Sequence, residues 1–342
     1  MRLWLSGLVP LVYALTLPIA ARCGDDGHSS YPPNATAELP SWLPGVWSRE
    51  WIEERGVRSS TFDVHYLQTP TFFGDVRLPL DRPKFPHAAS FRDLTDEELR
   101  ALAQQRGFTG RTTMAGAIAT WHHEIDFQPP DGIDDVDRLE RIAVERMHEN
   151  GLDGSYTESW RSISDGEERF LVIRTERAGR PARILLAAGD HFLYVRNRPN
   201  DLPEADSLDV LIAASRASRA QIIRYLDCEF SAGRVRNGSI PWEIQHSTLP
   251  WREGHHLDFV DEISLSGGAD GVGPRRPGAE RWTVPIDTLA PGELTSTRNA
   301  PVAHRVSGRP CGYAAKRDFG KSTQWYSSTA FASARTVETA TY

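Results

Sequence analysis

The segment TWHHEIDF brings two histidines and two carboxylates together within a few positions. If it forms a β-strand, successive side chains point to opposite faces. Trp121 and His123 then share one face, and His122, Glu124 and Asp126 share the other. The two histidines cannot bind one metal ion from such a strand, and a site on the second face would need a further ligand from a neighbouring strand. A solvent-exposed polar face is the simpler interpretation, and we predict no metal site.

His123 is the first candidate for acid–base chemistry, because its face also carries Trp121 and other apolar side chains. A polar group among aromatic residues is a common composition for a small-molecule pocket. We therefore expect a pocket lined by Trp121, His123 and residues from at least two other strands. The alternative is a core histidine that is hydrogen-bonded to the backbone.

Other expected strands also place a charged or polar side chain beside aromatic residues, as TFFGDVRLP and SYTESWRSI do. Buried charges are costly unless they are paired, so a mixed interior face would indicate a function. The alternative is a set of ion-paired or surface residues, since the pattern alone does not say which face is interior. The candidate catalytic residues are His123, Asp75, Arg77, Glu158 and Tyr66. The candidate ligand-binding residues are Trp121, Trp47, Arg49, Gln68, Tyr194 and His246.

Strands dominate the middle of the chain, separated by clusters of turn-forming residues such as RLPLDRPKFP and DFQPPDG. Two helices are expected, one from the capping signals of LTDEELRALAQQRG and one over SLDVLIAASRASRAQIIRYL. Neither helix is placed to form a βαβ unit, so the pattern favours a sandwich or an antiparallel barrel. The expected strands cover residues 46–55, 60–68, 71–78, 113–127, 155–163, 168–176, 182–188, 191–197, 227–234 and 241–248.

The ends of the chain differ from this middle. Residues 1–21 have the pattern of a secretory signal peptide, and 22–40 are typical of a linker. Residues 259–342 are rich in Gly, Pro, Ser, Thr and Ala, so we expect them to be mostly disordered, with short ordered pieces near Trp282 and Tyr313. A real signal would make the protein secreted or place it in the secretory pathway, with no stable membrane span after cleavage; otherwise it is cytoplasmic.

Charge and cysteine content exclude several classes of protein. The net charge is −7 over 342 residues, with no clustered basic surface, so no nucleic-acid partner is expected. The three cysteines, Cys23, Cys228 and Cys311, are too scattered for a disulfide framework or a zinc site. No phosphate loop, dinucleotide fingerprint, nucleophile elbow or HExxH motif occurs, which argues against the commonest kinases, NAD enzymes, hydrolases and zincins.

The opening of the first strand, LPGVWSREW, contains Gly45-x-Trp47 and resembles the Gly-x-Trp start of lipocalin and calycin barrels. In those barrels the tryptophan closes one end, commonly against a basic side chain, for which Arg234, Arg236 and Arg252 are candidates here. Segments such as TWHHEIDFQPP, AAGDHFLYVRNRP and HSTLPWREG also resemble a group of uncharacterised, mostly microbial lipocalin-like proteins. The resemblance implies a mainly β fold over residues 41–258, a calycin-like antiparallel barrel of about 8–10 strands with one or two helices. It carries no reaction and no catalytic residue.

Three functions remain compatible with these observations. The first is a small-molecule binding protein that holds a partly apolar ligand in the barrel cavity. The alternative is a cofactor-free enzyme of specialised metabolism, an isomerase, cyclase, dehydratase or lyase, in which the histidine transfers a proton and an arginine stabilises negative charge. A third, haem-binding hypothesis needs His65, His123, His191 or His246 to point inward. We expect no cofactor, and the sequence does not indicate an oligomeric state.

Overall fold

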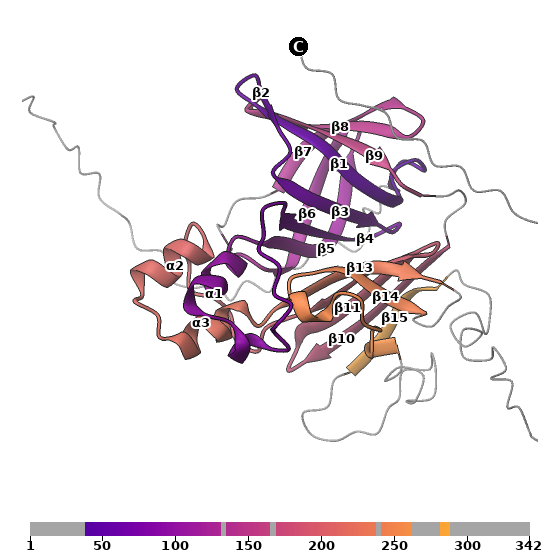
Figure 1. The fold of residues 1–342 in the computed structure, drawn as a ribbon. Helices are drawn as coiled ribbons and strands as arrows, with labels where there is room; N and C mark the ends of the chain where they lie inside the picture. Colours follow the sequence, from indigo (N-terminus) through magenta and orange to yellow (C-terminus); the bar gives the residue numbers. More distant parts are fainter. Residues whose placement is uncertain (1–37, 131–134, 165–168, 237–240, 261–280, 288–342) are drawn as a thin grey trace, which may run out of the picture. The chain divides into compact units, whose positions relative to one another are not determined.

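A computed structural model describes residues 38–130, 135–164, 169–236, 241–260 and 281–287. The expected signal peptide, nearly all of the linker and most of the segment 259–342 lie outside the described residues. The described chain is mainly β (Figure 1). Its strands fall into two antiparallel sheets, and no helix of the described part is long and apolar enough to span a membrane.

The first sheet closes into an eight-stranded antiparallel barrel, which confirms the expected fold class. Closure comes from β1, which pairs with β3 on one side and with β9 on the other, and β2 adds a hairpin arm to β1. The strands of this sheet are β1 (Gly45–Glu54), β2 (Val57–Ser59), β3 (Phe62–Gln68), β4 (Phe72–Pro79), β5 (Arg106–Ala115), β6 (Ile118–Asp126), β7 (Asp135–Ala143), β8 (Arg146–Gly151) and β9 (Tyr156–Ser162).

One expected strand needs correction, and two observed strands were not predicted. The segment 113–127 is not one strand, because Gly116 has a φ of 62° and turns the chain between β5 and β6. A hairpin turn of this kind needs a positive φ, which glycine adopts without steric cost. The strands β7 and β8 were not expected at all.

Aromatic side chains fill one end of the barrel. Trp47, Tyr66, Phe73 and Trp160 belong to one buried cluster inside the barrel wall, and Trp47 is only 2% exposed. The indole Nε1 of Trp47 donates to the carbonyl oxygen of Leu43 at 2.9 Å. This end is therefore closed, as the Gly-x-Trp pattern suggests.

A tryptophan takes the place of the basic side chain that was expected beside Trp47. The ring of Trp42 packs edge-on against it, with centroids 6.4 Å apart. Arg234 and Arg252, two of the expected candidates, instead pair with Asp190 and with Glu229 and Asp258. The described chain shows no arginine over the Trp47 ring.

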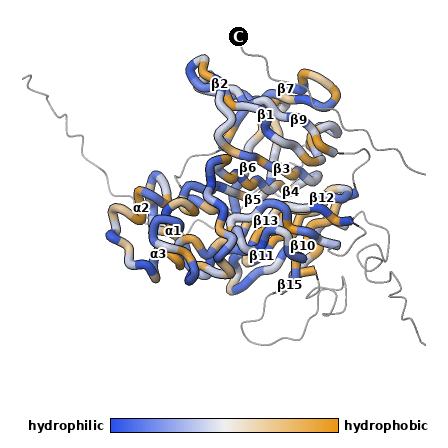
Figure 2. The backbone as a smooth tube through the Cα atoms, viewed as in Figure 1, coloured by the Kyte–Doolittle hydropathy of each residue, from blue (hydrophilic) through white to orange (hydrophobic). Residues whose placement is uncertain are grey.

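The remaining strands do not complete the barrel but form a second, open sheet in the order β14-β13-β12-β11-β10-β15. Both faces of this sheet are covered: one faces the barrel wall and the helices, and the other, which carries Trp242, packs on Leu257 and Phe259. Every residue from Ile184 to Ala188 is accordingly buried, and Figure 2 shows hydrophobic stretches in this sheet and in the helices. Its strands are β10 (Phe170–Arg177), β11 (Arg180–Ala188), β12 (His191–Arg196), β13 (Glu229–Val235), β14 (Trp242–Ser247) and β15 (Arg281–Asp287).

Two glycines let the barrel wall approach the second sheet closely. A Cβ atom at Gly74 of β4 would lie 2.6 Å from a methyl group of Leu193, and one at Gly107 of β5 would lie 2.9 Å from the ring of Phe230. Both distances are too short for real carbon atoms, so only glycine fits. The outer faces of β4 and β5 thus belong to the core, which leaves their other faces inside the barrel.

Three α-helices are present among the described residues: α1 (Asp96–Leu102), α2 (Leu208–Ala214) and α3 (Arg219–Leu226). The capping box predicted for α1 is formed by Thr95 and Glu98. The helix expected over 207–226 is two helices. The chain leaves α2 at Ser215, takes a positive φ of 46° at Arg216 and begins α3 at the cap Ser218.

Candidate functional site

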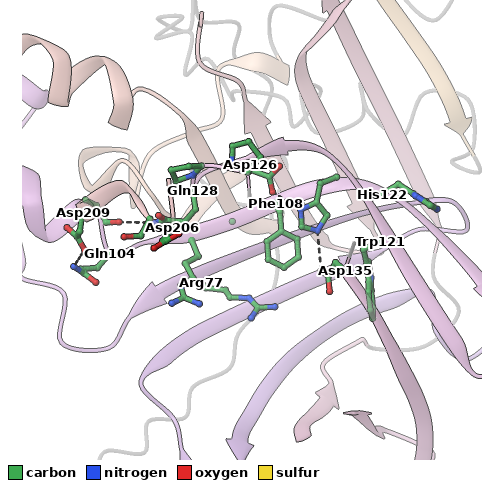
Figure 3. A pocket seen from close by; sticks show the side chains of 17 residues that line it. Arg77, Gln104, Phe108, Trp121, His122, Asp126, Gln128, Asp135, Asp206 and Asp209 are labelled. Atoms are coloured by element: carbon green, nitrogen blue, oxygen red, sulfur yellow. Dashed lines mark hydrogen bonds and ion pairs between the residues drawn. The ribbon is translucent and has the colours of Figure 1, made fainter. Parts of the chain in front are cut away.

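A polar cleft of about 730 Å³ lies at the open end of the barrel, opposite the end that Trp47 closes. Strands β4, β5, β6 and β7 supply Arg77, Phe108, His123 and Asp135 to one side of it. Figure 3 shows Gln104, Asp206 and Asp209 on the other side, beside α1 and the start of α2. The volume is within the range of small-molecule sites, about 300–1,000 Å³. The full lining is Arg77, Ala103, Gln104, Arg106, Gly107, Phe108, Trp121, His122, His123, Asp126, Gln128, Pro129, Pro130, Asp135, Asp206, Ser207 and Asp209.

Strand register brings the side chains of the cleft together. Phe108 pairs with Asp126, and Gly110 pairs with His123 across a register shift between β5 and β6. Trp121 pairs with Asp135 of β7. A Cβ at Gly110 would lie 1.9 Å from the carbonyl oxygen of His122, so the shift depends on glycine. The cleft thus contains Trp121 and His123 with residues of three further strands, the arrangement that the alternation in the sequence suggested.

His123 is held by two carboxylates. Its Nδ1 lies 2.7 Å from Asp126 Oδ1, its Nε2 lies 3.1 Å from Asp135 Oδ2, and its ring stacks on Phe108. Burial acts to lower the pKa of His123, but hydrogen bonds to and the charges of Asp126 and Asp135 outweigh it and raise the pKa to about 9. At neutral pH His123 is therefore a fixed imidazolium cation.

Buried ion pairs lie deeper in the barrel. Arg49 bonds to Glu158, Arg77 Nε bonds to Asp75 Oδ1 at 2.9 Å, and Arg77 Nη1 lies 3.6 Å from Glu158 Oε1. Burial raises the pKa of Asp75, and the charge of Arg77 opposes this rise. Four of the predicted site residues thus neutralise one another inside the barrel. Asp75 Oδ2 and Glu158 Oε2 are buried and make no hydrogen bond to the described residues.

A second carboxylate group beside these pairs escaped the sequence analysis. Glu149 is 8% exposed, and burial together with the charge of Glu158 raises its pKa well above the ordinary value. It shares a hydrogen bond with Asp137, which also accepts a hydrogen bond from the hydroxyl of Tyr156. Glu149 is therefore a buried carboxyl group whose surroundings favour the protonated form.

Tyr66 belongs to a closed hydrogen-bond network near the filled end. Its hydroxyl donates to Gln68 Oε1 and accepts from Trp121 Nε1 at 3.0 Å. Thr112 Oγ1 donates to the same Gln68 oxygen at 2.8 Å. Burial raises the pKa of Tyr66 far above its ordinary range. Both hydrogen-bonding functions of the phenol are used, so Tyr66 and Gln68 position Trp121 rather than face the cleft.

Arg106 is the cation of the cleft that has no carboxylate partner among the described residues. It is exposed at the rim, with its guanidinium 5.4 Å from the ring centroid of Phe62. Partial desolvation and the positive charges of Arg77 and Arg49 lower the pKa of Arg106. Arg106 and Phe108 were not predicted as site residues, because residue 107 was expected at the end of a helix. The apolar alternation of Phe108, Gly110, Thr112 and Met114 could have indicated β5.

Two predicted ligand-binding residues lie outside the barrel. Tyr194 belongs to the second sheet and packs on Phe259, with ring centroids 4.9 Å apart. His246 on β14 stacks over His65, with ring centroids 4.1 Å apart. Burial, followed by the charge of His65, lowers the pKa of His246 to about 4, so this imidazole is neutral at neutral pH. Trp47 is inside the barrel but at its closed end.

The metal arrangement considered for His122 is also not formed. His122 bonds to Thr113 Oγ1 at 2.9 Å, whereas Glu124 pairs with Arg174 and Arg111. Asp126 is bonded to His123. Within the described ranges, the residues whose donor atoms could hold a metal ion are Asp63, His65 and His246.

No protein-family model matches the sequence, and no curated protein matches it. A crystal structure of an uncharacterised protein from Saccharomyces cerevisiae is similar over 72% of this chain and 100% of that chain, with 10% sequence identity and a TM-score of 0.41. A likeness this distant carries no functional information. The closed barrel is consistent with a lipocalin-like barrel, and membership of the microbial group named above stays a prediction.

Proposed function

We propose that this protein binds a small, partly apolar molecule with an acidic group, in the cleft at the open end of the barrel. A β-barrel with one closed and one open end is compatible with ligand binding. The observation that carries the proposal is Arg106, a cation at the rim without an ion-pair partner among the described residues. An anionic group of a ligand would pair with this guanidinium.

Aromatic and proline side chains in the same cleft can contact the apolar part of such a ligand. Phe108 and Trp121 line the cleft, as do Pro129 and Pro130. His123 is held at the cleft wall by its stacking on Phe108, and its charge is neutralised by the two carboxylates that it bonds. The carboxylates Asp126 and Asp135 are already bonded to His123 and compete little for the guanidinium of Arg106.

The geometry does not favour the alternative of a cofactor-free enzyme. A general base must be unprotonated and must have a free electron pair to accept a proton. Both ring nitrogens of His123 are bonded to carboxylates, and its pKa of about 9 keeps it protonated. Asp75 and Glu158 are paired with arginines. The candidate acid–base groups are thus used to hold one another.

The proposal is tested by fluorescence titration of the full chain with two aromatic probes of similar shape. 1-Anilinonaphthalene-8-sulfonate is an anion, and N-phenyl-1-naphthylamine is uncharged. In Arg106→Gln, binding of the anion weakens about tenfold or more, because one charge-assisted hydrogen bond is lost. Binding of the uncharged probe is unchanged. Arg138→Gln, on the exposed face of β7, is the matched control. Equal binding of the anion by both variants overturns the proposal.

A further inference from the structure

We propose that Asp63, His65 and His246 form a binding site for a divalent transition-metal ion of the zinc type, which links the barrel to the second sheet. Asp63 and His65 lie on the outer face of β3, and His246 comes from β14 of the other sheet. One donor atom from each residue lies within 4.8 Å of the other two. Two imidazoles and one carboxylate are ligands that zinc, cobalt and nickel accept.

Each imidazole donor lies near one oxygen of the Asp63 carboxylate, at a separation that neighbouring ligands of one ion have. His65 Nε2 lies 3.1 Å from Asp63 Oδ1, and His246 Nδ1 lies 3.3 Å from Asp63 Oδ2. Ligands about 2.1 Å from a tetrahedral zinc are about 3.4 Å apart, and octahedral neighbours are about 3.0 Å apart. Both observed distances fall between these limits or close to them.

The orientation of His65 separates this arrangement from an ordinary hydrogen-bonded pair. Its Nε2 is buried and makes no hydrogen bond to a described residue, although the Asp63 oxygen is only 3.1 Å away. The oxygen therefore lies off the axis of the nitrogen. Two ligands of a common ion show this geometry, because each points at the ion and not at the other ligand.

The surroundings leave room for an ion and its water. A cavity of about 110 Å³ adjoins both imidazoles, and it is lined mainly by apolar residues of β3, β12 and β13. The side chains of Asp63, His65 and His246 are 36%, 21% and 31% exposed, so the cluster lies near the surface although His65 Nε2 itself is buried. Three protein ligands with an open position for water are typical of zinc sites that are not purely structural.

The nearest competing cation is held elsewhere. The positive charge of Arg82 lowers the pKa of both Asp63 and His246. Its guanidinium donates to Glu253 Oε1 at 2.6 Å, to the carbonyl oxygen of Ser247 at 2.6 Å and to Gln105 Oε1 at 2.9 Å. The carboxylate of Asp63 therefore remains available to a metal ion, and Glu253 offsets the charge of Arg82.

The test is a titration of the untagged, chelator-treated full chain with Co²⁺ and Zn²⁺. We expect one equivalent of Co²⁺ to bind, with visible d–d absorption bands that Zn²⁺ removes. His65→Gln and His246→Gln weaken binding at least tenfold. His148→Gln is the matched control, since His148 is another strand histidine, packed edge-on against Trp51, and it leaves binding unchanged.

A second measurement guards against variants that fold poorly. Zn²⁺ raises the melting temperature of the wild-type chain because it binds only the folded state. The two ligand variants, each shown by circular dichroism to be folded without metal, lose this rise, whereas His148→Gln keeps it. Absence of saturable binding overturns the proposal, and so does binding that His65→Gln and His246→Gln leave intact.

Discussion

His123 lies face to face with Phe108, with ring centroids 4.6 Å apart and planes inclined by 9°. The same imidazole is bonded through both nitrogens to Asp126 and Asp135. A protonated ring over an aromatic face adds a favourable cation–π interaction of about 0.5–2 kcal/mol. The wall of the cleft is therefore built around an imidazolium that is paired with two carboxylates.

This charge predicts a loss of stability at alkaline pH. The pKa of His123 rises from 6.5 in the unfolded chain to about 9, so its contribution is complete below pH 6.5 and disappears as the pH rises through 9. The free energy of unfolding falls by up to about 3 kcal/mol over this range. Urea unfolding at several pH values measures the fall, and His123→Phe shows a smaller one. An imidazole NMR titration midpoint near 6.5 would contradict the assignment.

The closed end of the barrel predicts a difference between two tryptophans of the same strand. Trp47→Ala leaves a cavity in the cluster around Trp160 and costs about 3–5 kcal/mol of unfolding free energy. Trp51 is only half-buried and packs on His148 and Arg58, so Trp51→Ala costs clearly less. Chemical denaturation compares the two variants. Equal losses of unfolding free energy would show that Trp47 does not close this end of the barrel.

The buried pair of Arg49 and Glu158 predicts non-additive effects. Arg49→Met leaves a buried carboxylate without its closest partner and costs about 3–5 kcal/mol, reduced by whatever Arg77 compensates from 3.6 Å. Adding Glu158→Gln removes the orphaned charge, so the double variant is more stable than Arg49→Met alone. A double-mutant cycle by urea unfolding tests this. Losses that simply add would indicate that the two side chains do not interact.

The raised pKa of Glu149 predicts that replacing this residue by glutamine stabilises the folded protein. The pKa of Glu149 is raised in the folded state above its value of 4.5 in the unfolded chain. Its contribution to the free energy of unfolding is therefore complete only below pH 4.5 and is lost as the pH rises. Glu149→Gln keeps the shape without the acid and raises the melting temperature at pH 7 by about 2–4 °C for each kcal/mol gained. At pH 4 the variant and the wild type differ little. A lower melting temperature of the variant at pH 7 would contradict the raised pKa of Glu149.

The alternation of side chains correctly predicted which residues share a face of a strand, but it did not predict which face is interior. Asp75, Arg77 and Glu158 were placed on mixed faces with aromatic residues, and the structure brings them together with Arg49. The pattern could not show that these charges pair across strands, because pairing depends on register. The register of β1 on β9 includes a shift between Arg49 and Trp51, which the sequence does not mark strongly.

Strands β7 and β8 were missed because both of their faces are polar. Asp137 and Glu149 point inward, while Arg138 and Glu140 are exposed. Charged residues on both faces erase the apolar alternation on which strand prediction depends. The charged interior of the open end thus concealed the strands that build it.

The second sheet illustrates a different limit. Its strands β10 to β14 were expected at nearly the observed positions, but as part of the barrel, whereas β15 was not expected as a strand. The buried run Ile184–Ala188 fits a strand that is covered on both faces, whichever sheet it joins. Only the pairing of β1 with β9 shows that the barrel closes without it. Close contacts such as that of Gly74 with Leu193 then build a layer that sequence periodicity cannot show.

The most direct measurement is to identify the small molecule that the full chain retains. The wild-type protein and the variants Arg106→Gln and Arg138→Gln are incubated with a metabolite extract, purified, denatured, and analysed for released molecules by mass spectrometry. The account predicts an unchanged, acid-bearing, partly apolar molecule in the wild type and in Arg138→Gln, and at least tenfold less of it in Arg106→Gln. A retained molecule without an acidic group, equal retention by all three proteins, or none retained by the wild type would contradict it.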